Sequence, residues 1–218
     1  MTAFTAWDIA RNLLMAARWT VVLSIVSLVG GGVVGLSILV LRTGAGPVGR
    51  AVTRAYIEVF QGTPLLMQLF LAYFGLGLLG FDVPAWLAAG ITLTLWAAAF
   101  LAEIWRGCVE AINRGQWEAS ASLGMGYLQQ LHHIILPQAL KIAIPPTVGF
   151  SVQVIKGTSL TSIIGFVELS KAGAAITNAT FKPLLVYGMV ACLYFVLCWP
   201  LSKGSQMLER HLNVPHHR

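Results

Sequence analysis

The chain has 218 residues, of which 57% are hydrophobic and only 10% are charged, and its mean hydropathy is +0.77. Soluble domains carry about a quarter charged residues, so this chain has too few ionised side chains to cover a soluble globule. Its apolar content also excludes an intrinsically disordered protein. The formal charge of +6 does not indicate nucleic acid as a partner, because the basic residues lie in short clusters between apolar runs. We therefore predict an all-α integral membrane protein, with residues 1–218 forming one transmembrane domain.

The apolar runs predict about five transmembrane helices, since one crossing of the bilayer needs roughly 20 residues. The first span is expected at 19–41, where glycines 30–35 include a G-x-x-x-G that lets another helix approach closely. The second is expected at about 64–81, directly after a Gly-Thr-Pro interruption, with helix beginning before it. A tight turn at 81–84 then leads into the third span, 85–105, so that the second and third spans form a hairpin.

The longest polar interval, 106–141, is predicted to be the main loop between spans, with two short helices between Arg106 and Tyr127. A fourth span begins at 142–155 and contains Pro145 and Pro146, so we expect it to be bent or broken. The segment 168–183 is interpreted as an extramembrane or interfacial connection. The fifth span is predicted at about 184–201.

Basic residues predict the orientation of these five spans. Nine of them fall on one side of the membrane and five on the other, so we expect the nine-residue side to be cytoplasmic. The N-terminus is then outside, and the loop 106–141 and the C-terminal tail are cytoplasmic. The opening residues do not resemble a cleaved signal peptide. The nine are Arg42, Arg50, Arg54, Arg106, Arg114, Lys141, Lys203, Arg210 and Arg218; the five are Arg11, Arg18, Lys156, Lys171 and Lys182.

No residue pattern predicts a catalytic or metal site. The three cysteines lack the spacing of a zinc site or a disulfide framework, and the adjacent pairs His132-His133 and His216-His217 have no acidic or cysteine partner placed to complete a metal site. No G-x-x-x-x-G-K-[ST] phosphate loop occurs, so we do not expect this chain to bind or hydrolyse ATP. The spans also lack a Ser/His pair or paired carboxylates, which argues against a membrane-embedded enzyme.

The loop between the third and fourth spans contains apolar residues that need a surface to pack on. Leu123, Met125 and Tyr127 lie outside the predicted spans. They either rest on the membrane domain of the same chain or contact a partner protein, and their spacing alone does not distinguish the two.

The sequence of this loop resembles a known motif. Glu118-Ala119-Ser120, three residues, Gly124, nine residues and then Ile134-x-Leu136-Pro137 match the EAA-x3-G-x9-I-x-L-P signature of permease subunits of bacterial ABC importers, with Ser120 where the family has Ala. Further similarity covers most of the chain and narrows toward the polar amino-acid uptake type. It is carried by QGTPLLMQLF, AEIWRG, GQWEASASLG, LPQALKIAIPP, KGTSL and GFVEL, in this order.

The resemblance implies a multi-pass permease of the bacterial inner membrane, with five spans and an external N-terminus. It implies two separate ATP-binding cassette subunits that carry ATP and magnesium, a second permease chain, identical or paralogous, and an external solute-binding protein that delivers an amino acid. This chain itself is expected to bind no cofactor. The loop would form a coupling helix that docks on the ATPase. The residues expected at this contact are Glu118, Ala119, Ser120, Leu123, Gly124 and Met125.

Polar residues at membrane depth are candidates for the substrate pathway, because they are costly there unless they face protein or water. For Glu103, we favour an intrahelical ion pair with Arg106 over contact with substrate. For Glu58, a structural role and contact with substrate have equal weight. Glu58 and Lys156 would suit the ammonium and carboxylate of a zwitterionic amino acid if both face one cavity. The candidates are Glu58, Gln61, Thr63, Gln68, Glu103, Gln153, Lys156, Thr158 and Ser159.

Three departures from the family pattern affect this region: Gly157 replaces an Asp, Gln61 stands where Arg is frequent, and Gly149 where Asn is common. The resemblance to the family therefore does not predict which substrate this chain carries. A secondary transporter or a channel subunit for small polar solutes is the alternative function. Either would explain the apolar spans and the interrupted helix, but neither would explain the loop motif.

Overall fold

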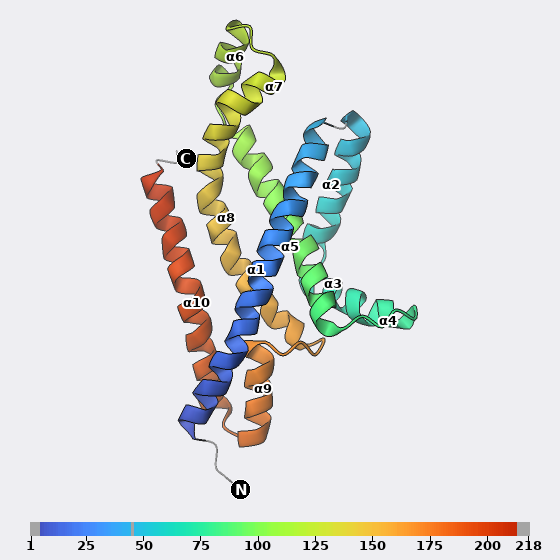
Figure 1. Ribbon diagram of the computed structural model, residues 1–218, viewed down its shortest axis with the longest axis vertical. Coiled ribbons are helices and arrows are strands. Elements are labelled where there is room, and N and C mark those ends of the chain that lie inside the picture. Colours follow the sequence, from blue (N-terminus) through green and yellow to red (C-terminus); the bar gives the residue numbers. More distant parts are fainter. Residues whose placement is uncertain (1–4, 45, 213–218) are drawn as a thin grey trace.

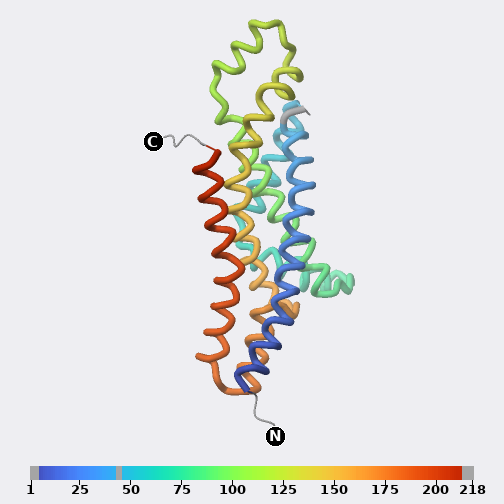
Figure 2. Tube along the Cα trace, turned by 60° about the vertical axis from the view of Figure 1, so that its left-hand side comes forward, coloured from blue at the N-terminus to red at the C-terminus, as the bar shows by residue number. Residues whose placement is uncertain are grey.

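The computed structural model describes residues 5–44 and 46–212, and this part of the chain is helical without any β-strand. Four long helices, α1, α5, α8 and α10, run roughly along the long axis of the molecule (Figures 1 and 2). Helices α6 and α7 protrude at one end, which we call the loop end, and α9 lies at the other, the α9 end. The elements are α1 (Ala6–Gly44), α2 (Gly46–Gly62), α3 (Leu65–Phe70), the π-helical η1 (Leu71–Gly75), α4 (Leu76–Leu78), α5 (Ala85–Glu110), α6 (Arg114–Ser122), α7 (Tyr127–Gln130), the π-helical η2 (Leu131–Ile135), α8 (Leu136–Thr158), the 3-10 turn η3 (Ser159–Ser162), α9 (Leu169–Thr180) and α10 (Pro183–His211).

The number of spans agrees with the prediction. Four helices are long and apolar enough to cross a membrane, and a fifth crossing is present if α2 and the bent segment after it count as one. The first described residues lie at the α9 end and the last at the loop end (Figure 1), as an odd number of crossings requires. Which end is cytoplasmic stays a prediction.

Helix α1 is much longer than the apolar run that predicted it. Its 39 residues extend over about 58 Å, well beyond the roughly 30 Å of a bilayer core. The predicted span 19–41 is therefore only the middle and end of the helix. The preceding turns, 6–18, remain helical because they pack against α9 and α10 rather than lipid.

The second span differs most from the prediction. Residues 64–81 do not form one straight crossing, because α2 and the following Leu65–Leu78, which we call the arm, meet at a bend of 102°. The arm projects sideways from the bundle (Figure 1). Pro64, with an extended ψ of 133°, lacks an N–H and separates the two helices. The first half of this crossing is α2. Its apolar residues are interspersed with charged ones, so the apolar runs in the sequence did not predict it as part of a span.

The helices of the fourth and fifth spans both continue through their internal prolines. The helix from Tyr127 to Ser162 runs without a break through Pro145 and Pro146, so the expected interruption is absent. The Ser205 hydroxyl of α10 donates to the Pro145 carbonyl at 2.8 Å, which ties α10 to α8 at this position. Helix α10 also contains Pro200 and extends ten residues beyond the predicted end at Leu201. The predicted connection 168–183 contains a helix of its own, α9.

Close packing between α1 and α5 confirms the prediction made from the glycines. A Cβ added to Gly31 would lie 2.7 Å from the Ala97 Cβ and 3.2 Å from the Ala98 nitrogen, and one added to Gly35 would lie 3.0 Å from the Ala98 carbonyl oxygen. Ala97 and Ala98 are fully buried. Small residues on both helices therefore bring the two backbones together, as membrane helix interfaces require.

Replacing Gly31 should separate these helices. We expect Gly31→Val to destabilise the purified chain by about 1–3 kcal/mol, because the added atoms meet backbone that is unable to move aside. Thermal unfolding in detergent measures this effect. Gly32→Val is the matched control, since a Cβ at Gly32 would meet only a Trp105 ring atom at 3.8 Å. Equal melting temperatures for the two variants would contradict the proposed contact.

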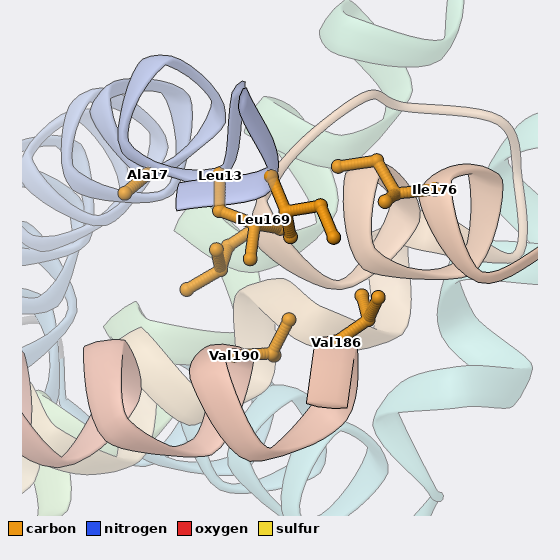
Figure 3. Close-up of a cluster of buried hydrophobic side chains, with 7 residues drawn as sticks. Leu13, Ala17, Leu169, Ile176, Val186 and Val190 are labelled. Carbon is orange, nitrogen blue, oxygen red and sulfur yellow. The ribbon is translucent and has the colours of Figure 1, made fainter. Parts of the chain in front are cut away.

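The α9 end has a hydrophobic core of its own (Figure 3). Leu13 and Ala17 of α1 meet Leu169 and Ile176 of α9, and Val186 and Val190 of α10 close the cluster. Leu13, Leu169 and Val186 are fully buried. Helix α9 is thus held as part of the bundle, although it is too short to cross a membrane.

Candidate functional site

The loop at the loop end is a folded unit. Asn113 caps α6, because its side-chain oxygen accepts a hydrogen bond of 2.8 Å from the backbone N–H of Gly115. Trp117 of α6 stacks on Tyr127 with ring centroids 5.8 Å apart. Ile112 and Ile135 are buried beneath them and join the loop to the ends of α5 and α8. The surface of this loop is therefore held rigidly at the tip of the bundle.

Most of the predicted coupling residues are exposed there. Glu118, Ala119 and Gly124 are open to solvent, and the Leu123 side chain is 80% exposed. Gly124 has a φ of +74°, which an L side chain rarely adopts, and nothing lies within 4 Å of a Cβ placed there. Of the apolar residues that need a surface, Tyr127 stacks on Trp117 of the same loop but stays 56% exposed, and Leu123 is exposed still further.

Two predicted coupling residues have different surroundings. Ser120 is only 3% exposed, and its hydroxyl donates to the Trp117 carbonyl, so it stabilises α6 from within and offers no surface to a partner. Met125 is half-buried, and its carbonyl accepts a hydrogen bond of 2.6 Å from the Gln130 side chain. The exposed coupling surface consequently consists of Glu118, Ala119, Leu123 and Gly124.

The polar residues around the break between α2 and α3 form a hydrogen-bonded group. The Gln68 amide nitrogen donates to the carbonyls of Phe60 and Thr63 at 2.9 and 3.1 Å and contacts the Thr63 hydroxyl at 2.9 Å. Carbonyls near the interruption at Pro64 are satisfied in this way. The Gln68 amide oxygen is buried without a partner, while Gln61 donates to the Ala99 carbonyl of α5 at 3.3 Å.

Glu58 and the residues of α8 are not brought into contact. The Glu58 carboxylate accepts a hydrogen bond of 2.7 Å from Arg54 one turn earlier, with both side chains exposed. Gln153 and Lys156 project from α8 as exposed side chains. Thr158 is fully buried and bonds to the Ile155 carbonyl, and the Ser159 hydroxyl bonds to that of Lys156.

Glu103 belongs to an ion-pair network near the loop end. It pairs with Arg106, as the structural alternative predicted, and also with Arg42 of α1, whose Nη1 lies 3.2 Å from its Oε2. Arg106 also pairs with Glu110. This network connects α1 to α5. In the single chain, Glu103 is occupied by two guanidinium groups, so a role in substrate binding has no support from these contacts.

Sequence reasoning missed Glu168, a fully buried residue at the centre of a polar cluster at the α9 end. Its two carboxylate oxygens accept hydrogen bonds of 2.8 Å from the backbone N–H groups of Ser170 and Lys171 in the first turn of α9. Tyr194 of α10 donates to it at 2.9 Å, and Thr20 of α1 lies 3.5 Å away. Burial raises the pKa of this carboxyl, while its hydrogen bonds act in the opposite direction. The available signal was its place inside GFVEL.

Among residues 5–44 and 46–212, no group of three or more His, Cys, Asp or Glu side chains converges on one point. His132 and His133 lie in η2, and the His133 Nδ1 lies 3.1 Å from the Gln129 carbonyl oxygen. His216 and His217 lie outside the described residues.

Together these features define a helical membrane protein with an interrupted span and a rigid, exposed loop at one end. The sequence matches the model of the family described as "Binding-protein-dependent transport system inner membrane component" over residues 31–212. The chain belongs to this family. It is a permease subunit of an ABC importer in the bacterial inner membrane, and in such systems a separate subunit hydrolyses ATP.

Named relatives agree with this assignment. The chain is 35% identical to the probable amino-acid ABC transporter permease protein YckA of Bacillus subtilis (strain 168), over 88% of this chain and 85% of that one. It is 33% identical to the glutamine transport system permease protein GlnP of Escherichia coli (strain K12), over 95% and 96% of the two chains.

Solved structures show the same fold. A chain in the crystal structure of an amino acid ABC transporter with histidines superposes with a TM-score of 0.89 at 32% identity, covering 92% of this chain and 94% of that one. A chain of the inward-facing MetNI methionine ABC transporter gives a TM-score of 0.71 at 20% identity, with 94% and 96% covered, and supports the fold alone.

Proposed function

We propose that this chain is the permease of an ATP-driven importer for amino acids, and that it encloses the translocation pathway together with a second permease chain. The exposed surface of Glu118, Ala119, Leu123 and Gly124 is the observation that supports coupling to a separate ATPase. A small helix with an exposed apolar residue and a neighbouring glycine suits a groove on a partner protein.

The partners follow from this proposal. Two ATP-binding cassette subunits would each engage the loop of one permease chain and would carry ATP and magnesium. An external solute-binding protein would deliver the substrate. A second chain, identical or paralogous, is favoured because the polar residues of α2 and α8 are exposed in the single chain although they belong to membrane spans. Facing a water-filled path between two chains would remove the cost of placing them in lipid.

Co-purification tests the function. The tagged chain would be expressed with its neighbouring genes, and ATP hydrolysis would be measured in vesicles with and without the candidate binding protein and a panel of amino acids. We expect an ATPase to co-purify and its hydrolysis to rise with the binding protein and one class of amino acid. If no ATPase co-purifies and the chain alone moves solute, a secondary transporter or channel replaces this proposal.

Glu58 and Lys156 are the proposed contacts for the charged ends of an amino acid. A charge-assisted hydrogen bond contributes about 1.5–3 kcal/mol, so we expect the double variant Glu58→Gln, Lys156→Met to lower uptake at least about tenfold. Uptake of radiolabelled amino acid into vesicles with the assembled importer measures this. Because Glu58 already pairs with Arg54, the variant Arg54→Gln separates loss of that pair from loss of substrate contact. Normal uptake by the double variant would contradict the proposed contacts.

A further inference from the structure

Helices α1 and α5 leave an apolar groove open in the half of the bundle nearer the α9 end. Toward the loop end, α2 covers this helix pair, with Ile57 packed against Ile38, Ala98 and Ala102. Helix α2 ends at Gly62, and the chain then turns away into the arm. The uncovered groove has a volume of about 880 Å³. It is lined by residues 19–26 of α1, 85–95 of α5 and the segment 165–167.

The lining of the groove suits a flexible hydrocarbon occupant. Val22, Val26 and Ile91 are each about half exposed, and Thr94 is the one threonine among mostly apolar lining residues. Gly90 lies in the groove, and a Cβ added there would meet nothing within 4 Å. A side chain at this position would therefore fill the groove without disturbing the core.

Aromatic and basic groups lie at one end of the groove. The lining residues Trp19 and Trp86 are 45% and 61% exposed, and the Arg18 guanidinium carbon lies 5.4 Å from the centroid of the Trp19 ring. Tryptophan at the end of an apolar stretch is typical of the level of lipid headgroups, where arginine extends toward phosphate. The ion pairs found among the described residues do not include Arg18.

We propose that this groove binds an anionic phospholipid, with an acyl chain along α1 and α5 and the phosphate beside Arg18. The apolar trough and the cation at its end match the two parts of such a molecule. The exposed arm of a second copy is the competing occupant, because it is also apolar. Leu65–Leu78 contains no acidic residue, however, and would leave Arg18 without a partner. The arrangement of charge therefore favours the lipid.

Native mass spectrometry of the full-length chain tests this assignment, with phosphatidylglycerol and the zwitterionic phosphatidylcholine as probes. We expect one tightly retained phosphatidylglycerol, which Gly90→Leu abolishes by filling the groove. Gly188→Leu is the matched control, since Gly188 is also a helical glycine with open space around its Cβ position and lies on α10, outside the groove. In Arg18→Gln, the preference for phosphatidylglycerol over phosphatidylcholine should fall about fivefold, as expected for loss of one basic residue at the membrane surface.

Two results would show that the groove does not hold a lipid. One is equal lipid retention by the parent chain, Gly90→Leu and Gly188→Leu. The other is an efficient disulfide between Ile91→Cys in one copy and Phe74→Cys in the arm of a second copy within the assembled complex, which would assign the groove to the arm. A preference for phosphatidylglycerol that survives in Arg18→Gln would contradict the placement of the phosphate.

Discussion

Gly124→Val should disrupt the coupling between the permease and its ATPase while leaving the membrane domain folded. A β-branched residue is strained at a φ of +74°, by about 1–2 kcal/mol or more, so the turn after α6 would change shape. Because no atom lies within 4 Å of the added Cβ, the bundle itself should be unaffected. We expect hydrolysis stimulated by the binding protein to fall at least about tenfold, measured with the assembled importer in vesicles.

Gly126→Val provides the matched control for this experiment. Gly126 lies two residues away in the same turn, but its φ of −68° is an ordinary value for any residue. Full stimulated hydrolysis by the Gly124→Val complex would show that the backbone at this turn does not position the ATPase contact. A strong loss in both variants would indicate that added bulk, rather than backbone conformation, disturbs the loop.

Glu168→Ala should destabilise the whole α9 end. The change removes the acceptor of the half-buried N–H groups of Ser170 and Lys171 and leaves the Tyr194 hydroxyl with its Ser170 Oγ contact but without the carboxylate. Removing one member of a buried charged network costs about 3–5 kcal/mol. We expect a large fall in the thermal unfolding temperature of the purified chain and faster hydrogen exchange in α9.

Smaller changes to the same cluster should give graded effects. Tyr194→Phe removes the hydrogen bonds of the Tyr194 hydroxyl with Glu168 and Ser170 and should cost about 1–2 kcal/mol, while Glu168→Gln should fall between this variant and Glu168→Ala. Asp82→Ala, in an exposed turn, is the control for loss of an acidic residue. If Glu168→Ala unfolds at the same temperature as Asp82→Ala, the cluster does not hold α1, α9 and α10 together.

The loop motif shows how far local sequence can predict a site. The spacing from Glu118 to Pro137 indicated the loop, and the structure exposes four of its six candidate residues. The motif did not show that Ser120 is buried, with its hydroxyl bonded to the Trp117 carbonyl instead of exposed to a partner. The nine candidates for the substrate pathway were identified as polar residues within or beside the predicted spans. The proposed pathway, in which Glu58 and Lys156 contact one substrate, involves a second chain that the sequence of this one does not describe.

Local sequence by itself determined the class of this protein, the spans α5 and α10 and the presence of a close helix contact at the glycines of α1, because each depends on local composition or on small residues at helical spacing. Only the tertiary structure decided the rest. Helix α2 carries Arg50, Arg54 and Glu58 and is stabilised by packing Thr53 and Ile57 into the bundle. Glu168 is tolerated in the interior because donors from three separate helices converge on it, and no local pattern reveals that convergence.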